Sequence, residues 1–161
     1  MGFTNNIVLK KIWQDVHCLE VKITCSSCVI SATTQVYLTE NLIDNLCYQI
    51  EKFCNNTIET FEWKSGDFGD SSTACVMLAF SRKDTLGHIL IEVSMELDDG
   101  ASFSKHNCCF YVHAELGQLC SFGEKVAILL DRNSVGYSAA LNSTGDGLGD
   151  KGTVCVNPIE K

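Results

Sequence analysis

A single helical stretch set among extended runs constrains the fold of this 161-residue chain more than any other feature. Between residues 40 and 54, apolar side chains recur every three to four positions, which is the period of an α-helix with one buried face. Thr39 precedes the stretch as an expected N-cap, and Glu40 lies at the positive end of the helix dipole. The side chains of the apolar face are Leu42, Ile43, Leu46, Cys47, Ile50, Phe53 and Cys54.

Most of the remaining chain consists of short runs rich in valine, isoleucine and threonine, which are typical of β-strands. Three such runs precede the helix, between residues 6 and 38, and four or more follow it. In the run 88–97, every second residue from Ile89 to Leu97 is apolar, whereas Glu92, Ser94 and Glu96 are polar. This alternation gives a strand one buried and one exposed face, and it predicts an antiparallel sheet covered on one side.

These patterns predict an α+β fold with a mostly antiparallel sheet of six to eight strands and one strong amphipathic helix. A second helix is expected from about Glu115 to Leu130, where Gly117 and Gly123 each weaken it by roughly 1 kcal/mol and favour a break. We expect residues 1–130 to form a single α+β domain. Residues 131–161 are rich in glycine, serine and asparagine, which predicts a mobile tail in which GTVCVN (152–157) adds a short edge strand.

The charge balance bears on the class of partner. Twenty acidic and twelve basic residues give a formal net charge of −8, which repels the phosphates of nucleic acids and of anionic membranes. No apolar run approaches the roughly 20 residues that cross a bilayer. We therefore expect a cytoplasmic protein that binds neither nucleic acid nor membrane, and whose charge attracts a basic protein.

Ten cysteines raise the question of a metal site or a disulfide. Cys25 and Cys28 form a C-x-x-C pair, and His106 with Cys108 or Cys109 would complete a Cys3His zinc site. Consecutive strand residues point to opposite faces, so only one of the last two thiols can reach the metal; the set is Cys25, Cys28, His106 and Cys109. A disulfide between Cys25 and Cys28 is a second possibility. The apolar neighbours of most cysteines favour a third interpretation, reduced core thiols in a protein without a cofactor.

No known catalytic signature is present in the sequence. It lacks G-x-S-x-G, H-E-x-x-H, a phosphate-binding loop and the glycine-rich dinucleotide fingerprint. Histidines and carboxylates occur between residues 88 and 115, but nothing in the sequence fixes their geometry, and acidic residues on an exposed strand face are usually solvated. We therefore predict a protein that is not an enzyme.

A set of acidic residues is expected on the exposed sides of the later strands and in the loops between them. Aromatic residues lie close to them in the sequence, and aromatic anchors surrounded by charge are typical of protein interfaces. Alternation requires that at least Phe61 or Trp63 be buried; the other aromatic residues are Phe68, Phe103 and Tyr111. The predicted partner-binding residues are Glu59, Glu62, Asp67, Asp70, Glu92, Glu96, Asp98 and Asp99.

Several short strings occur in an order that resembles a known group of proteins. They are Tyr37-Leu38-Thr39 with the following helix, then WKSGD, HILIEV, DDG, HNCCFYV and ELGQL, within residues 18–130. The order resembles the small bacterial immunity proteins of contact-dependent toxin systems. The resemblance implies a single-domain cytosolic α+β protein that binds and neutralises a cognate toxin without a cofactor or catalysis.

The sequence thus favours a non-enzymatic protein-binding module, an immunity or inhibitor protein whose acidic surface covers a basic toxin or nuclease. Two alternatives stay open. One is a phage or mobile-element protein that acts against host defence by sequestering a host protein or a small ligand. The other is a zinc-stabilised domain of unknown role.

Overall fold

The computed structural model describes residues 2–70, 72–97 and 106–141, and these residues form two helices and two β-sheets. The helices are α1 (Glu40–Cys54) and α2 (Leu116–Ile128). The strands are β1 (Asn6–Gln14), β2 (Leu19–Ser26), β3 (Ser31–Leu38), β4 (Thr60–Lys64), β5 (Val76–Arg82), β6 (His88–Glu96), β7 (Asn107–Glu115) and β8 (Ser138–Ala140).

The strands of the described residues form two four-stranded sheets. The first sheet has the order β3-β2-β1-β8 and the second has the order β4-β5-β6-β7, and every neighbouring pair is antiparallel. Helix α1 connects β3 of the first sheet to β4 of the second, and β8 returns to the first sheet. The predicted α+β class and antiparallel pairing are confirmed, but the strands are divided between two sheets instead of forming one.

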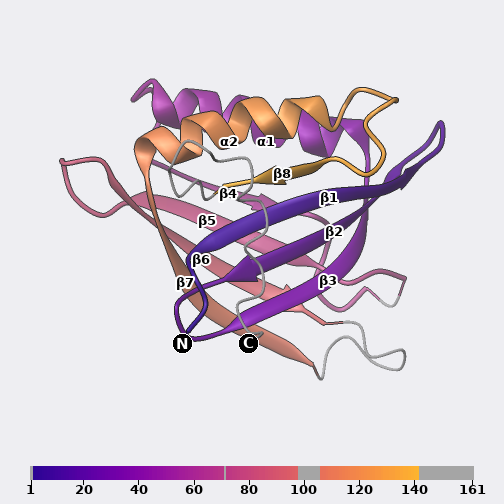
Figure 1. The fold of residues 1–161 in the computed structure, drawn as a ribbon, viewed down its shortest axis with the longest axis horizontal. Coiled ribbons are helices and arrows are strands. Elements are labelled where there is room, and N and C mark those ends of the chain that lie inside the picture. The colour runs from indigo at the N-terminus through magenta and orange to yellow at the C-terminus, as the bar shows by residue number, and fades with distance from the viewer. Residues whose placement is uncertain (1, 71, 98–105, 142–161) are drawn as a thin grey trace.

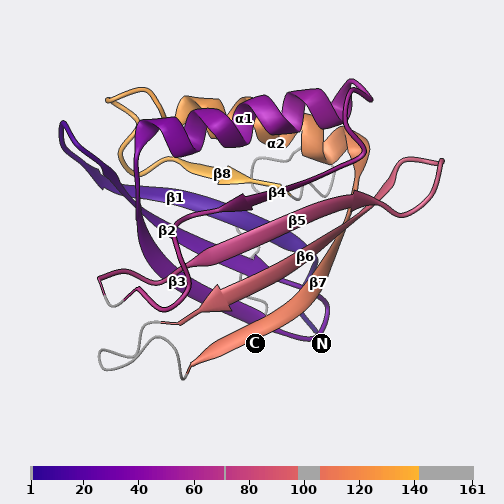
Figure 2. The ribbon, with the colours of Figure 1, turned by 180° about the vertical axis from the view of Figure 1, so that it is seen from behind.

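The two sheets face each other, and the two helices lie side by side across one open side of this sandwich (Figures 1 and 2). Helix α1 packs next to β4, and α2 packs next to β8. Alternate residues of the strands point into the space between the sheets and form the core with the buried faces of both helices. Aromatic contacts join these parts, because Phe61 stacks on Phe80 at 4.3 Å and meets the edge of Phe53 of α1 at 5.6 Å.

Both helices predicted from the sequence are present, and α1 has the predicted buried face. The Thr39 hydroxyl accepts a hydrogen bond from the Leu42 amide at 3.2 Å, as expected of an N-cap. Helix α2 runs without the expected break. A Cβ atom on Gly123 would lie 2.9 Å from the Cγ2 atom of Ile50, so this glycine allows close approach of the two helices.

The chain remains in the fold beyond residue 130, so the tail predicted to begin at residue 131 starts too early. Strand β8 pairs with β1, and Ala139 and Leu141 are buried in the core. The Leu141 amide donates a hydrogen bond to the Ile7 carbonyl at 2.8 Å. The stretch was missed because it is only three residues long as a strand and is surrounded by turn-forming residues. The edge strand predicted at 152–157 lies outside the described residues.

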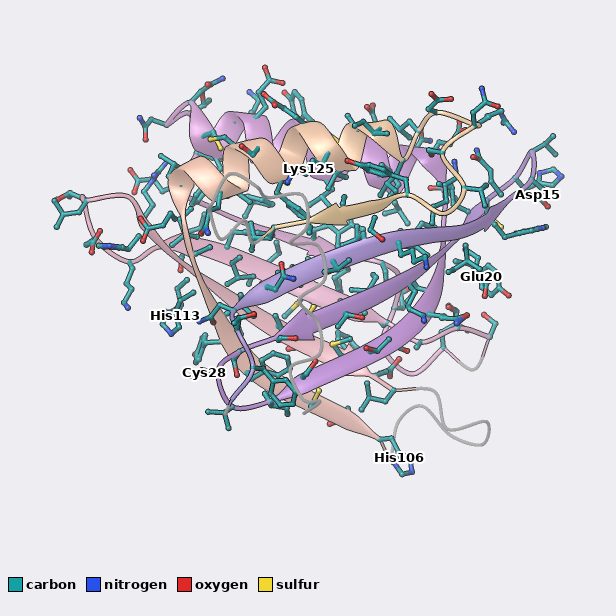
Figure 3. All side chains as sticks on the ribbon, viewed as in Figure 1. Asp15, Glu20, Cys28, His106, His113 and Lys125 are labelled. Carbon is teal, nitrogen blue, oxygen red and sulfur yellow. The ribbon has the colours of Figure 1, made fainter. Side chains whose placement is uncertain are left out.

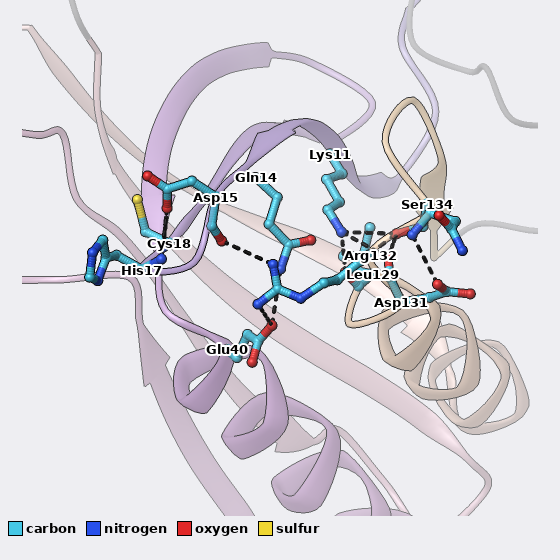
Figure 4. Close-up of polar contacts among 11 residues, drawn as sticks. Lys11, Gln14, Asp15, His17, Cys18, Glu40, Leu129, Asp131, Arg132 and Ser134 are labelled. Carbon is cyan, nitrogen blue, oxygen red and sulfur yellow. Dashed lines mark hydrogen bonds and ion pairs between the residues drawn. The ribbon is translucent and has the colours of Figure 1, made fainter.

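A buried lysine of β1 forms hydrogen bonds with the segment that follows α2 (Figure 4). The side chain of Lys11 is fully buried, and its Nζ atom donates hydrogen bonds to the Leu129 and Asp131 carbonyls, each at 2.9 Å. A third bond, of 3.2 Å, reaches the Ser134 hydroxyl. The ammonium group thus has a partner for each of its three protons, and it lies at the carbonyl end of α2, where a positive charge is favourable.

Candidate protein-binding face

The outward side of the second sheet carries part of the predicted acidic set. Strand register aligns Glu62 of β4, Ala79 of β5, Glu92 of β6 and Tyr111 of β7 in one row across the sheet. These positions alternate with the buried Trp63, so their side chains point away from the core, toward the viewer of Figure 2. We call this row and the hollows beside it the acidic face.

The two glutamates of this row are separated by a single small residue. Glu62 and Glu92 lie two strands apart with Ala79 between them, which corresponds to about 10 Å between their backbones. Within the described ranges neither carboxylate forms an ion pair, and Glu92 Oε2 only accepts a weak hydrogen bond from the Cys109 thiol at 3.6 Å. Both negative charges are therefore available to a ligand that approaches the sheet.

Two hollows lie next to each other along β6 and β7 on this side of the sheet. The larger has a volume of about 610 Å³. Its floor includes the small residues Ala79 and Ser81, and Glu62, Glu92 and Tyr111 contribute to its lining. The second hollow has a volume of about 430 Å³, and Phe68, Ser94 and Cys109 contribute to its lining.

Each hollow is lined by one exposed aromatic side chain. Tyr111 is 50% exposed in the larger hollow, and Phe68 is 45% exposed in the smaller one. Phe61 and Trp63 are buried, consistent with the expectation that at least one of them belongs to the core. The remaining aromatic residue of the predicted set, Phe103, lies outside the described residues. The acidic face thus combines carboxylates with aromatic anchors, as protein-recognition surfaces do.

The other predicted partner-binding residues are more dispersed. Glu59 is exposed just before β4, and Asp67 and Asp70 are exposed in the loop between β4 and β5. The Asp70 carboxylate is engaged locally, because it accepts hydrogen bonds from the Ser72 amide and hydroxyl, which lower its pKa. Asp98 and Asp99 lie outside the described residues.

Glu96 is buried, and its prediction as an accessible binding residue is wrong. Only 3% of its surface is exposed, because the loop between β4 and β5 folds over the end of β6. Its Oε2 atom accepts a hydrogen bond from the Gly69 amide at 2.8 Å, and its Oε1 atom accepts one from the Cys75 amide at 3.0 Å. Glu96 therefore positions this loop, and with it Phe68, beside the acidic face.

The structure does not bring the four candidate zinc ligands together. Cys25 is buried between the sheets, whereas Cys28 is exposed in the turn that follows β2. Cys109 is exposed on the outward side of the second sheet, and Figure 3 shows His106 far from Cys28, just before β7 begins. Nowhere in the described part of the chain do three or more His, Cys, Asp or Glu residues form a group that could hold a metal ion.

The cysteines occupy several environments. Burial raises the pKa of Cys25 and Cys75, and it raises the pKa of Cys47 to about 11. A thiol of this kind stays protonated at neutral pH and packs as a small apolar group. All cysteines of the described ranges are free thiols, and Cys28 and Cys109 are the exposed ones.

The histidines of the later strands lie on the surface. His88 Nδ1 is 2.6 Å from Asp84 Oδ2, and its Nε2 atom is 3.5 Å from Glu115 Oε2. The hydrogen bond and charge of Asp84, followed by the charge of Glu115, raise the pKa of His88. His113 lies on the same side of the sheet, where its Nδ1 atom is 3.5 Å from Lys83 Nζ. These contacts join the ends of neighbouring strands.

Sequence reasoning missed Lys11, although its position contains a signal. In β1 the buried residues Ile7 and Leu9 are followed at the same spacing by Lys11, so alternation alone places this lysine on the inward side. Arg132 also joins the C-terminal end of α2 to the beginning of α1, because its guanidinium lies 3.6 Å from the Glu40 carboxylate (Figure 4). Both contacts support the fold at the end of α2.

A scan against protein-family models and searches of curated proteins and of solved structures found no match to this chain. Among the described residues, neither helix has the length and apolar character needed to span a bilayer.

Proposed function

We propose that this protein is a cytoplasmic, non-enzymatic binding module, an immunity or inhibitor protein that neutralises a basic toxin or nuclease. The acidic face is the proposed contact surface. The observation that supports this proposal most is the row of Glu62, Ala79, Glu92 and Tyr111. Its two carboxylates, which form no ion pair with any described residue, flank a hollow bordered by an exposed aromatic ring.

The chemistry of the face favours a lysine- or arginine-rich partner. A cationic side chain that enters the larger hollow would meet both carboxylates and the face of Tyr111, which attracts cations. The net charge of −8 adds long-range attraction, which accelerates encounter and weakens as salt is added. Phe68 and Tyr111 would supply the apolar anchors that limit dissociation.

The proposal can be tested by affinity capture from a lysate of the native host at low and at moderate salt. We expect the wild-type protein to capture a basic protein, and the double variant Glu62→Lys/Glu92→Lys to bind it at least about tenfold more weakly. The matched control is Glu51→Lys/Glu124→Lys, which makes the same charge change at exposed positions of α1 and α2. The control should bind like the wild type apart from a weaker long-range attraction.

Neutralisation needs a second measurement. The captured protein is purified, and its toxicity or nuclease activity is measured with an equal amount of the wild-type protein or of each variant. Loss of activity with the wild type and with the control variant, but not with Glu62→Lys/Glu92→Lys, would support an inhibitor. Binding that is insensitive to the charge reversal would contradict the proposed surface, and unchanged toxin activity in the complex would contradict neutralisation.

One observation favours the alternative of a protein that sequesters a small ligand for a phage or mobile element. The volume of the larger hollow, about 610 Å³, falls within the range of small-molecule sites. Under this alternative, small cations should raise the melting temperature of the wild type but not that of Glu62→Lys/Glu92→Lys, and capture should yield no toxin. The zinc-stabilised alternative predicts stoichiometric zinc in protein purified without chelator.

A further inference from the structure

Helices α1 and α2 are packed closely, and their interface contains several cysteines. Gly123 of α2 lies against Ile50 of α1, and the Cys47 thiol is 3.8 Å from the Gly123 carbonyl oxygen. Figures 1 and 2 show the two helices side by side along their lengths. The Arg132 guanidinium, just beyond α2, lies 3.6 Å from the Glu40 carboxylate at the start of α1, so the two helices are antiparallel. Residues of α1 that follow Ile50 therefore lie opposite residues of α2 that precede Gly123.

Cys54 and Cys120 are neighbours in this alignment. Cys54 lies one turn beyond Ile50, and Cys120 lies one turn before Gly123. The two side chains are close enough that the Cys120 thiol contributes to the raised pKa of Cys54. Both side chains are partly exposed, so a small reagent in solution can reach the pair.

A positive charge lies beside the pair. The Arg82 guanidinium donates a hydrogen bond to the Phe53 carbonyl and lies 4.4 Å from the centre of the Phe53 ring, next to Cys54 in the chain. A nearby guanidinium stabilises a thiolate as it forms during exchange. Burial and the Cys120 thiol outweigh this effect in the resting protein and raise the pKa of Cys54 to about 12, so Cys54 is protonated at neutral pH.

We propose that Cys54 and Cys120 are an oxidisable dithiol that forms a disulfide between α1 and α2 when the protein meets a disulfide oxidant such as oxidised glutathione. The inference concerns a modification site that is separate from the acidic face, because the pair lies between the helices and the face lies on the outward side of the second sheet. It therefore does not depend on the proposed function.

The exchange takes place in two steps. The first step begins at Cys120, which loses its proton to solvent and, as a thiolate, attacks one sulfur of oxidised glutathione, forms a mixed disulfide and releases one glutathione thiolate. Cys54 then loses its proton to solvent and attacks the Cys120 sulfur, which forms the intramolecular bond and releases the second glutathione thiolate. Two electrons pass from the protein dithiol to glutathione disulfide, which is reduced to two glutathione molecules after protonation.

A second pair of neighbouring cysteines provides an internal contrast. Cys25 lies near Cys108 between the two sheets, but Cys25 is fully buried, and burial raises the pKa of both thiols. Reactivity requires both access and a thiolate, so this pair should resist the reagent that oxidises Cys54 and Cys120. The two pairs therefore differ mainly in exposure.

Mass spectrometry tests the proposal directly. The reduced full-length protein is incubated with oxidised glutathione, alkylated, and digested with trypsin and a glutamate-specific protease. Cleavage after Lys52, Glu59, Glu115 and Glu124 places Cys54 in residues 53–59 and Cys120 in residues 116–124, apart from all other cysteines. We expect these two peptides to be crosslinked. A crosslink between other cysteines, or full alkylation of both peptides, would overturn the proposal.

Substitutions separate the pair from its neighbour on the same helix face. Cys54→Ser should stop the reaction at the mixed disulfide and leave one glutathione on Cys120, whereas Cys47→Ser should still form the crosslink. In the wild type the crosslink closes the segment 54–120, which includes the whole second sheet, and should raise the melting temperature by about 5–15 °C. An equal rise in oxidised Cys54→Ser would contradict the assignment.

Discussion

The central rows on the outward sides of the two sheets carry charges of opposite sign. In the first sheet, register aligns Ser138, Lys10, Lys22 and Gln35 in one row, so two lysines lie directly opposite each other. The corresponding row of the second sheet places Glu62 and Glu92 around Ala79. The net charge of −8 is thus distributed unevenly, and a basic partner should distinguish one side of the sandwich from the other. The inward sides, by contrast, are mostly apolar, and Lys11 and Thr34 are buried polar exceptions in the first sheet.

The largest effect is expected at Lys11, whose side chain points inward from β1. Lys11→Met removes three hydrogen bonds at the end of α2 and should lower the free energy of unfolding by about 2–4 kcal/mol. Urea denaturation measures this change. The neighbouring Lys10→Met, at an outward position of the same strand, should change stability by no more than about 0.5 kcal/mol. If both variants lost a similar free energy of unfolding, the inward position of Lys11 would not explain its larger expected effect.

A smaller loss of stability is expected at Glu96, an outward residue of the second sheet that the loop between β4 and β5 covers. Glu96→Gln replaces one carboxylate oxygen by an amide nitrogen that cannot accept a hydrogen bond from Gly69 or Cys75, and should cost about 1–3 kcal/mol. Hydrogen exchange of the Gly69 and Cys75 amides should become faster. Glu92→Gln, on the same strand but without backbone contacts of this kind, serves as the control. Unchanged exchange in Glu96→Gln would contradict the role assigned to this carboxylate.

The smallest effect concerns the pH dependence of the second sheet. Because contact with Asp84 raises the pKa of His88 above its ordinary value of 6.5, the contact stabilises the fold at pH values below the unfolded pKa. This stabilisation is lost as the pH rises through the higher, folded pKa. NMR titration should show that Asp84→Asn lowers the pKa of His88 more than Glu115→Gln does, since Asp84 is the larger cause. The reverse order would contradict the contact geometry.

Local patterns predicted the parts of the fold that depend on near neighbours in the chain. The periodicity of α1 and the alternation of residues 89–97 both arise from geometry that a few residues define. The division into two sheets depends on pairing between distant strands, above all β8 with β1, and no local pattern encodes it. The continuity of α2 was missed because the cost of Gly123 is offset by its contact with Ile50, which is distant in sequence.

The candidate site was predicted only in part, because local patterns give the side of a strand but not the pairing between strands. Alternation places Glu62 and Glu92 on one outward side, but only the register of β4, β5 and β6 brings them into a single row. Alternation also assigned Glu96 to the exposed side, and it fails there because a loop covers the position. The proximity of Cys54 and Cys120 could not be inferred from the sequence. It depends on the packing of two helices that are adjacent in space but have the four strands of the second sheet between them in the chain.

The pairing of β8 with β1 joins segments that leave the ribosome at very different times. Lys11 is synthesised 118 residues before Leu129, whose carbonyl accepts its hydrogen bond, and the edge of β1 stays unpaired until the still later β8 is made. During translation this edge is open to other nascent chains, a state that favours aggregation. Fragments that end before Ser138 would keep the edge open permanently, so a shortened gene product should accumulate as insoluble material.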